Sequence, residues 1–405
     1  MRLGHCLGLG LGVAFAIAAS APLTARAEDT IKIGFPIPLS GPTAVYGKPI
    51  LAGAELAVSQ INAAGGVLGK KLELLPRDSK ANADEAVRLS RELIIKDNVD
   101  FLLGTLTSAE APAVSTVAKE NKILFMTPSS KSTILTDAQH IHPYIFRLAS
   151  NTDVEGLAGA EGMAKFTNVK TIVTIAPDYA YGRDSIAAFI KALKEKAPNM
   201  QVVDSQWPKL GEPDFTAFIN AMMSKKPDAV YCSLFAGDFV TFVKQATPLG
   251  LFKAIDNRLI DGGEVGTPDE AQALGADYPY GIIANAYDPV IWSGGNEPPE
   301  HKKFVEDLKA FTHQQYASGW SIQGYVMVES LVQGIKKAGN TKSGDVSKAM
   351  AGMSFDTPVG KRSFSEKSHE TFAPEYTGVM VKDPNYPFAV IKDPTPQPTD
   401  FHPSN

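Results

Sequence analysis

Small polar residues follow the strand-like runs of the N-terminal half, at the points where a strand passes into a helix. Thr107 and Ser108 precede a helical pattern in "GTLTSAEAPA", and the stretch "TPSSKST" supplies Ser129, Ser130 and Lys131. The first turn of a helix leaves backbone N–H groups unpaired at the positive end of the helix dipole, so it can hold a carboxylate without a catalytic group. A purely structural role as N-cap is the alternative for Ser108, because serine is an ordinary cap.

A third such turn, "GPTAVYGK", carries two glycines, a hydroxyl and the aromatic Tyr46 but no phosphate-loop pattern. The chain has no G-x-x-x-x-G-K-[ST], H-E-x-x-H or G-x-S-x-G motif. The pair His140 and His142 has no Cys/His framework around it, so neither a metal nor a cofactor is expected. A secreted enzyme would need a nucleophile–base pair or a metal, and no sequence pattern indicates either.

The polar turns belong to an alternation of strands and helices. Strands are predicted at 31–38, 71–77, 100–104, 123–127, 171–176, 201–207, 229–233, 259–261, 376–382 and 388–392. Helices are predicted at 48–64, 83–96, 109–121, 153–166, 182–196, 215–225, 238–249, 299–316 and 322–337. Such an alternation predicts an α/β fold of parallel sheets with right-handed crossovers, in which ligands bind beyond the carboxyl ends of the strands.

Two successive series of this kind predict two doubly wound lobes, with a break near 144–151. The Pro-rich residues from 393 to 405 are expected to form a loosely ordered C-terminal tail. Hydrophobic residues make up 44% of the chain and charged residues 20%. This composition predicts a packed globular protein. The net charge of −5 does not favour a nucleic-acid partner, which requires a basic surface.

The N-terminal segment up to Ala27 differs from the rest of the chain. Arg2 is followed by an apolar run over 7–19 and by the small-residue pattern Ala25-Arg26-Ala27, which predicts a signal peptide cleaved before Glu28. The apolar run is too short to span a bilayer as an anchor. We therefore expect export to the periplasm, with Cys232 left as a single buried thiol and no internal disulfide.

Several stretches in order resemble the periplasmic substrate-binding proteins of ABC importers, of the leucine/isoleucine/valine-binding type. They are "IKIGFPIPLSGPTAVYG", "GTLTSAEAPAV", "FMTPSS", "IFRLASN" and "DYAYG", and the similarity runs from about residue 31 to about 392. The resemblance implies a type I periplasmic binding protein, with two lobes joined by a three-crossing hinge and a ligand held between them. It places the first lobe at 28–149 plus about 286–352, and the second at 150–285 plus about 353–392.

The resemblance also implies ligand contacts at matching positions. Tyr46 would border the cleft, Ser108 would hold the ligand carboxylate, and Ser129 would offer backbone groups. Glu264 in "DGGEVG" would pair with an α-ammonium group, and Tyr181 would close over the ligand.

Two positions depart from the amino-acid binders. Lys131 stands where they place a threonine and could pair with an anion or point to solvent, and Phe235 stands where they have a tyrosine.

The leading expectation is therefore a non-catalytic receptor, acting as a monomer, that binds a small hydrophobic amino acid and delivers it to an ABC importer permease. The departures at Lys131 and Phe235 motivate an alternative ligand, namely an aromatic carboxylate, an amide or urea. A secreted enzyme, or a receptor that serves a membrane sensor instead of a permease, are further alternatives.

Overall fold

The computed structural model of the 405-residue chain describes residues 30–291, 297–371 and 375–397, together with Met1 and Gly4. The predicted signal peptide lies outside this part of the chain, apart from those two residues. Within the described residues, no helix has both the length and the apolar composition that a membrane span requires.

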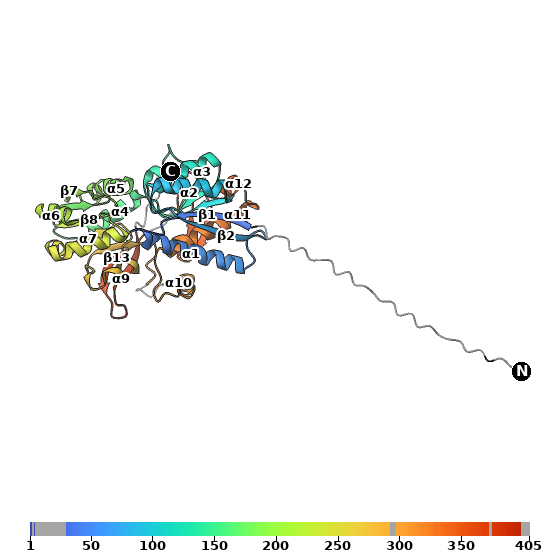
Figure 1. Cartoon of the computed structure of the whole chain (residues 1–405). Helices are drawn as coiled ribbons and strands as arrows, with labels where there is room; N and C mark the ends of the chain where they lie inside the picture. The colour runs from blue at the N-terminus through green and yellow to red at the C-terminus, as the bar shows by residue number, and fades with distance from the viewer. Residues whose placement is uncertain (2–3, 5–29, 292–296, 372–374, 398–405) are drawn as a thin grey trace.

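The first lobe is built on a five-stranded sheet in the order β2-β1-β3-β4-β5, in which every neighbouring pair is parallel. Its strands are β1 Thr30–Ile37, β2 Lys71–Asp78, β3 Phe101–Leu103, β4 Phe125–Thr127 and β5 Ile145–Arg147. The helices packed with it are α1 Ala44–Ala63, α2 Ala83–Ile95, α3 Glu110–Asn121, α10 Pro299–Thr312, α11 Ser321–Ala338 and α12 Ser343–Met350 (Figure 1).

The second lobe is built on a seven-stranded sheet in the order β14-β13-β10-β9-β8-β6-β7. Its strands are β6 Thr171–Ile175, β7 Gln201–Gln206, β8 Ala229–Cys232, β9 Leu259–Asp261, β10 Ile283–Ala286, β13 Glu375–Lys382 and β14 Ala389–Gln397. Its helices are α4 Thr152–Met163, α5 Ala180–Lys196, α6 Thr216–Ser224, α7 Ala236–Leu249, α8 Leu251–Ala254 and α9 Pro268–Leu274. Short 3-10 turns lie at η1 Thr133–Leu135 and η2 Gly275–Asp277.

The chain passes between the lobes three times, between β5 and α4, between β10 and α10, and between β12 and β13. The strands β11 Ser354–Thr357 and β12 Gly360–Ser363 form a separate hairpin, and Phe355 and Phe364 pack in the same hydrophobic cluster as β1 and α11. The two-lobed α/β fold predicted from the sequence is confirmed. The residue limits of the lobes stay a prediction.

The second sheet is not wholly parallel. β13 pairs antiparallel with β10, and β14 pairs antiparallel with β13. Asp393–Gln397 were expected in a loosely ordered tail, but they continue β14, with Thr395 opposite Thr377 and Pro396 opposite Tyr376. Proline is tolerated there because β14 is the edge strand, where one side of the backbone needs no partner.

The turn "GPTAVYGK" is already helical from Ala44, four residues earlier than the predicted start at 48. A Cβ atom on Gly47 would lie 1.8 Å from the carbonyl oxygen of Pro38. Only glycine therefore allows the first turn of α1 to pack against the end of β1. The early start puts Tyr46 in the first helical turn, where its side chain is fully buried.

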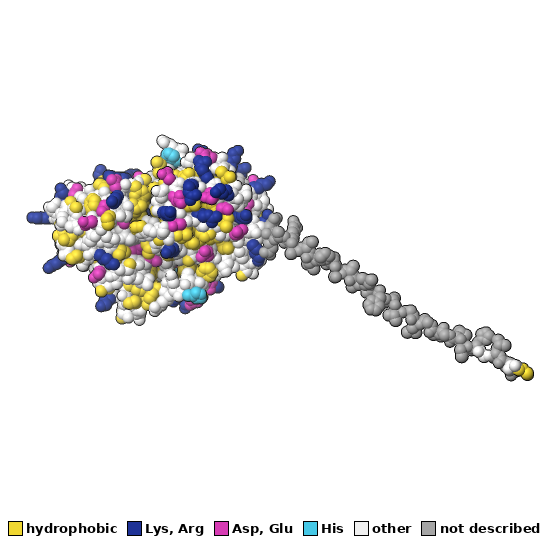
Figure 2. All heavy atoms as spheres, in the orientation of Figure 1, with side chains coloured by type: hydrophobic (Ala, Val, Ile, Leu, Met, Phe, Trp, Pro, Cys, Tyr) yellow, Lys and Arg dark blue, Asp and Glu magenta, His cyan; other side chains and the backbone are white. Residues whose placement is uncertain are grey.

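Charged side chains of both signs are interspersed over the face shown in Figure 2.

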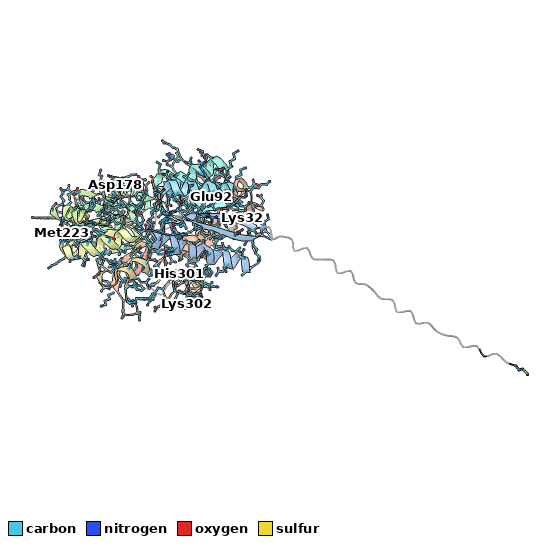
Figure 3. The ribbon with its side chains drawn as sticks, viewed as in Figure 1. Lys32, Glu92, Asp178, Met223, His301 and Lys302 are labelled. Carbon is cyan, nitrogen blue, oxygen red and sulfur yellow. The ribbon has the colours of Figure 1, made fainter. Side chains whose placement is uncertain are left out.

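A further titratable side chain, His301 of α10, is buried and is labelled in Figure 3. Its ring nitrogens lie 2.7 Å from Asp288 and 2.6 Å from Glu297. Cys232 is a buried free thiol in β8, as predicted.

Candidate functional site

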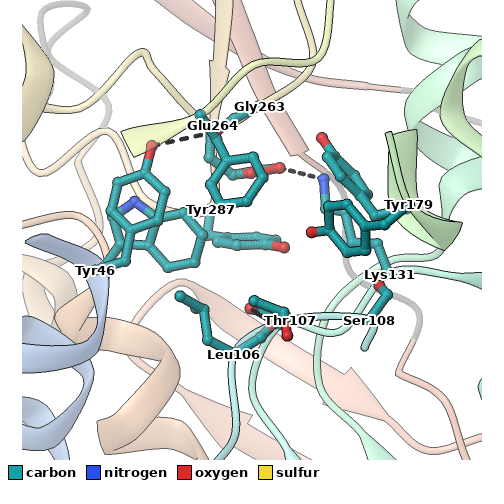
Figure 4. Close-up of a pocket in the computed structure, with 13 residues that line it drawn as sticks. Tyr46, Leu106, Thr107, Ser108, Lys131, Tyr179, Gly263, Glu264 and Tyr287 are labelled. Carbon is teal, nitrogen blue, oxygen red and sulfur yellow. Dashed lines mark hydrogen bonds and ion pairs between the residues drawn. The ribbon is translucent and has the colours of Figure 1, made fainter. Parts of the chain in front are cut away.

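A cavity with an empty volume of about 350 Å³ lies between the two lobes (Figure 4). Every residue predicted to contact a ligand lines this cavity except Ser130, which lies just behind it and donates to Ser108 Oγ at 3.4 Å. The structure therefore brings together side chains that are more than two hundred positions apart in the sequence. Their role in ligand binding stays a prediction.

Tyr46 reaches from the first lobe to the second. Its hydroxyl donates to the carbonyl of Gly263 at 3.3 Å and accepts from the backbone N–H of Ala236 at 2.8 Å. Its ring stacks on Trp320, with centroids 3.8 Å apart. Tyr46 is thus a wall of the cavity and also a direct link between the two lobes.

The turn before α3 offers one hydroxyl group to the cavity. Thr107 donates through its backbone N–H (3.0 Å) and its hydroxyl (2.9 Å) to the buried carboxylate of Glu110, so this acid occupies donors that a ligand could have used. Ser108 Oγ accepts from Ser132 N at 3.0 Å and from Ser130 Oγ. These bonds use the oxygen lone pairs of Ser108 and leave its O–H proton for a ligand acceptor.

Lys131 neither points to solvent nor offers a free charge to an anion, the two possibilities left open by the sequence. It is 4% exposed, and its ammonium group forms ion pairs with Glu155 (2.9 Å), Glu375 (2.6 Å) and Glu264. Figure 4 shows the ion pair with Glu264. An ammonium group has three N–H donors, and the three carboxylates account for all of them. The group of Lys131, Glu155, Glu264 and Glu375 is referred to below as the lysine–glutamate cluster.

Glu264 was predicted to pair with the ammonium group of an amino-acid ligand. In the structure its Oε1 accepts from Lys131 and, at 3.0 Å, from Asn285 Nδ2. Burial raises the pKa of Glu264 well above its ordinary value, and the neighbouring carboxylates of Glu375 and Glu155 raise the pKa further, against the effect of Lys131. Burial also raises the pKa of Glu155. Glu264 and Glu155 therefore retain their protons more readily than exposed carboxyl groups would.

Aromatic rings enclose the remaining sides of the cavity. Tyr181 and Phe235, both predicted, meet edge to face at 5.7 Å, and Tyr181 donates to Glu155 at 3.1 Å. Tyr179, Tyr287 and Trp320 also line the cavity. Together with Tyr46, these rings suit a flat apolar guest, because offset and edge-on ring contacts add to simple burial.

Sequence reasoning missed several of these groups. Tyr179 lay within the quoted "DYAYG" and could have been found by its spacing from Tyr181, since both flank the start of α5. Glu155 and Glu375 gave no local signal, because Glu155 is an ordinary helical acid and Glu375 opens a late strand. Only the pairing with Lys131 marks them as part of the site.

Two lobes joined by three chain crossings, with a polar and aromatic cavity between them, have the architecture of a solute-binding protein. Residues 30–383 match the family described as "Periplasmic binding protein", and the chain belongs to this family.

Among curated proteins, the "Leucine-, isoleucine-, valine-, threonine-, and alanine-binding protein" of Pseudomonas aeruginosa is 29% identical over 357 residues, which cover 88% of this chain and 91% of that protein. Among solved structures, a solute-binding protein of an ABC transporter from Rhodopseudomonas palustris BisB5, in complex with 3,4-dihydroxy benzoic acid, is 26% identical. It superposes with a TM-score of 0.80 and covers 91% of this chain and 98% of its own. An R. palustris solute-binding protein in complex with benzoate is 25% identical, with a TM-score of 0.79 and coverage of 92% and 98%.

Proposed function

We propose that this protein is a periplasmic receptor of an ABC importer that binds a small aromatic carboxylate between its lobes. The observation that carries the choice of ligand is the ion pair between Lys131 and Glu264, which fills the position expected for a ligand ammonium group. The relatives that bind benzoate and 3,4-dihydroxy benzoic acid support the aromatic assignment.

Lys131 already supplies a cation to Glu264, so an amino-acid ligand would have to share this carboxylate with it. Two like charges about 4 Å apart repel each other by about 4 kcal/mol at an effective dielectric constant of about 20, which offsets part of the attraction between a ligand ammonium group and the three carboxylates. A guest without an ammonium group does not need a share of Glu264. Phe235 in place of a tyrosine adds apolar surface to the same cavity, which also favours an aromatic body over a zwitterion.

The carboxylate of such a ligand needs a partner other than Lys131, whose three donors are already used. In this proposal it accepts from the hydroxyl of Ser108, near the positive end of the α3 dipole. The raised pKa values of Glu264 and Glu155 favour the neutral forms of these two acids, which lowers their repulsion of a ligand carboxylate.

Ligand capture is then a hinge closure. A ligand favours the closed form to the extent that it touches both lobes at once, and the cavity offers Ser108 from one lobe with Tyr181 and Phe235 from the other. The closed form would be the one that a permease recognises. No covalent step is needed, so the compound should leave the protein unchanged.

The test is a thermal-shift screen of the mature protein, followed by calorimetric titration. Benzoate and hydroxybenzoates are expected to raise the melting temperature, because a ligand that binds only the folded state stabilises it by RT ln(1 + [L]/Kd). Leucine, isoleucine and valine serve as the comparison ligands and are expected to leave the melting temperature unchanged.

A second candidate is a branched-chain amino acid, which the 29% identical relative favours. A shift with leucine and none with any aromatic acid would overturn the aromatic proposal in its favour. Mass spectrometry of the compound recovered after denaturation checks the receptor role, since chemical conversion of the bound compound would instead indicate an enzyme.

A further inference from the structure

Three polar atoms of the cavity wall have no hydrogen-bond partner among the described residues. They are Glu264 Oε2, the hydroxyl of Tyr287 and the indole Nε1 of Trp320. Each belongs to a side chain that is at most 4% exposed. Buried polar groups are paired in the great majority of cases, so an unpaired donor and acceptor that line one cavity point to a guest that supplies the missing partners.

Glu264 and Tyr287 lie on the same side of this cavity. Lys131 joins them, because its ammonium group pairs with Glu264 and lies 5.2 Å from the centre of the Tyr287 ring. Figure 4 shows both side chains reaching into the space between the lobes. Burial, and next the charge of Glu264, raise the pKa of Tyr287 well above its ordinary value, so its hydroxyl keeps its proton and can donate it.

The Oε1 atom of Glu264 is already engaged, since Lys131 and Asn285 both donate to it. The Oε2 atom therefore remains as the contact that Glu264 offers to a guest. An ammonium group there would be attracted by the carboxylates but would meet the like charge of Lys131, and a carboxylate would be repelled by Glu264 itself. An aromatic C–H would leave both Oε2 and the tyrosine hydroxyl unpaired.

We propose that the ligand carries a hydroxyl group on its ring, bound between Glu264 Oε2 and the hydroxyl of Tyr287. A hydroxyl group both donates and accepts, so it pairs with the two atoms together. If Oε2 is protonated, the ligand oxygen accepts from it instead, so the arrangement holds in either protonation state. The inference rests on the proposed function and narrows it from aromatic carboxylates to hydroxylated ones.

The test compares calorimetric affinities for benzoate, its three monohydroxy isomers and 3,4-dihydroxybenzoate. At least one hydroxylated acid is expected to bind wild-type protein about ten- to a hundredfold more tightly than benzoate, because a site with unpaired buried groups discriminates against the analogue that cannot pair them. Tyr287→Phe should lose about tenfold in affinity for that acid and much less in affinity for benzoate, which has no hydroxyl group to pair with Tyr287.

Two controls separate recognition from structure. The Tyr287 hydroxyl has no hydrogen-bond partner among the described residues, so Tyr287→Phe should melt at a temperature no lower than the wild type. Tyr325→Phe removes a tyrosine hydroxyl that donates to Gln60 at 2.8 Å, outside the cavity, and should leave every affinity unchanged.

Equal affinity of the wild type for benzoate and all hydroxylated acids would overturn this inference and leave the proposed function standing. An equal loss of both affinities in Tyr287→Phe would overturn it as well. Failure of every aromatic acid to bind would overturn the inference and the proposed function together.

Discussion

Replacing Lys131 by methionine tests the central electrostatic feature of the molecule. The substitution keeps a long unbranched side chain but removes the ammonium group that faces Glu155, Glu264 and Glu375, each within ion-pair distance. Lys131 is 4% exposed, so water cannot screen the carboxylates that remain. Removing one partner of a buried charge group costs about 3–5 kcal/mol.

This cost translates into a melting temperature. Unfolding entropy of about 2 cal/mol/K per residue gives a chain of this size about 0.8 kcal/mol/K, so each kcal/mol lowers the melting temperature by about 1.3 °C. Lys131→Met should therefore melt about 4–6 °C below the wild type at pH 8, measured by calorimetry. Lys194→Met, at an exposed position of α5, is the matched control and should shift the melting temperature by less than about 1 °C.

The stability lost in Lys131→Met should depend on pH in a defined direction. A carboxylic acid whose pKa is raised in the folded state favours folding at low pH and opposes it as the pH rises through the raised value. Lys131 lowers the pKa of Glu264 and of Glu155, so its removal raises both values further. The difference in melting temperature between wild type and Lys131→Met should therefore be smaller at pH 5 than at pH 8. An equal difference in melting temperature at pH 5 and pH 8, or no difference at pH 8, would refute this electrostatic account.

Three further outcomes are expected. Tyr46→Phe removes both hydrogen bonds across the cleft and should weaken ligand binding about tenfold in calorimetry, whereas an unchanged affinity would show that these bonds do not bias closure. Gly53→Ala should destabilise the protein by about 1–3 kcal/mol in urea unfolding, because the added methyl group overpacks the contact between α1 and α11. The new Cβ would lie 1.9 Å from the carbonyl oxygen of Ser321, whereas Gly344→Ala, the control, meets no atom nearer than 3.8 Å and should leave stability unchanged. Burial lowers the pKa of His301, but its two carboxylate partners raise it to about 9, so the wild type should be more stable than His301→Gln below about pH 6.5. That advantage should fade as the pH rises through 9, and an advantage that does not change with pH would contradict this assignment.

Much of the fold could be predicted because its signals are local. The strand that begins at residue 71 and the helix over 83–95 are encoded by hydrophobic periodicity and by the cap at Asn82, whose side chain accepts from Glu85 N. The same holds for the polar turns around Tyr46 and Ser108, since their positions after a strand point to the ligand edge of a sheet. The antiparallel pairing of β14 with β13 could have been inferred, because the connection from Lys382 to Ala389 is too short for a parallel crossover. The antiparallel pairing of β13 with β10 could not, because the two strands are far apart in the sequence.

The site was harder to predict in its electrostatics than in its location. Lys131 and Glu264 were both expected at the cavity, but their mutual ion pair spans 133 positions and the pair with Glu375 spans 244. No local pattern reports a contact of that range. The charge of a cavity depends on which distant groups neutralise one another, and for that reason the ligand class could not be decided from residue types.

The order of the strands also bears on how the protein is made. One edge of the second sheet consists of β13 and β14, which end at Gln397, and the core of the first lobe includes α11 and α12, which end at Met350. Neither half can complete its interior until the ribosome has synthesised these late elements. A nascent chain therefore stays incompletely folded until those elements emerge, and an incompletely folded chain can still pass through a narrow translocation channel.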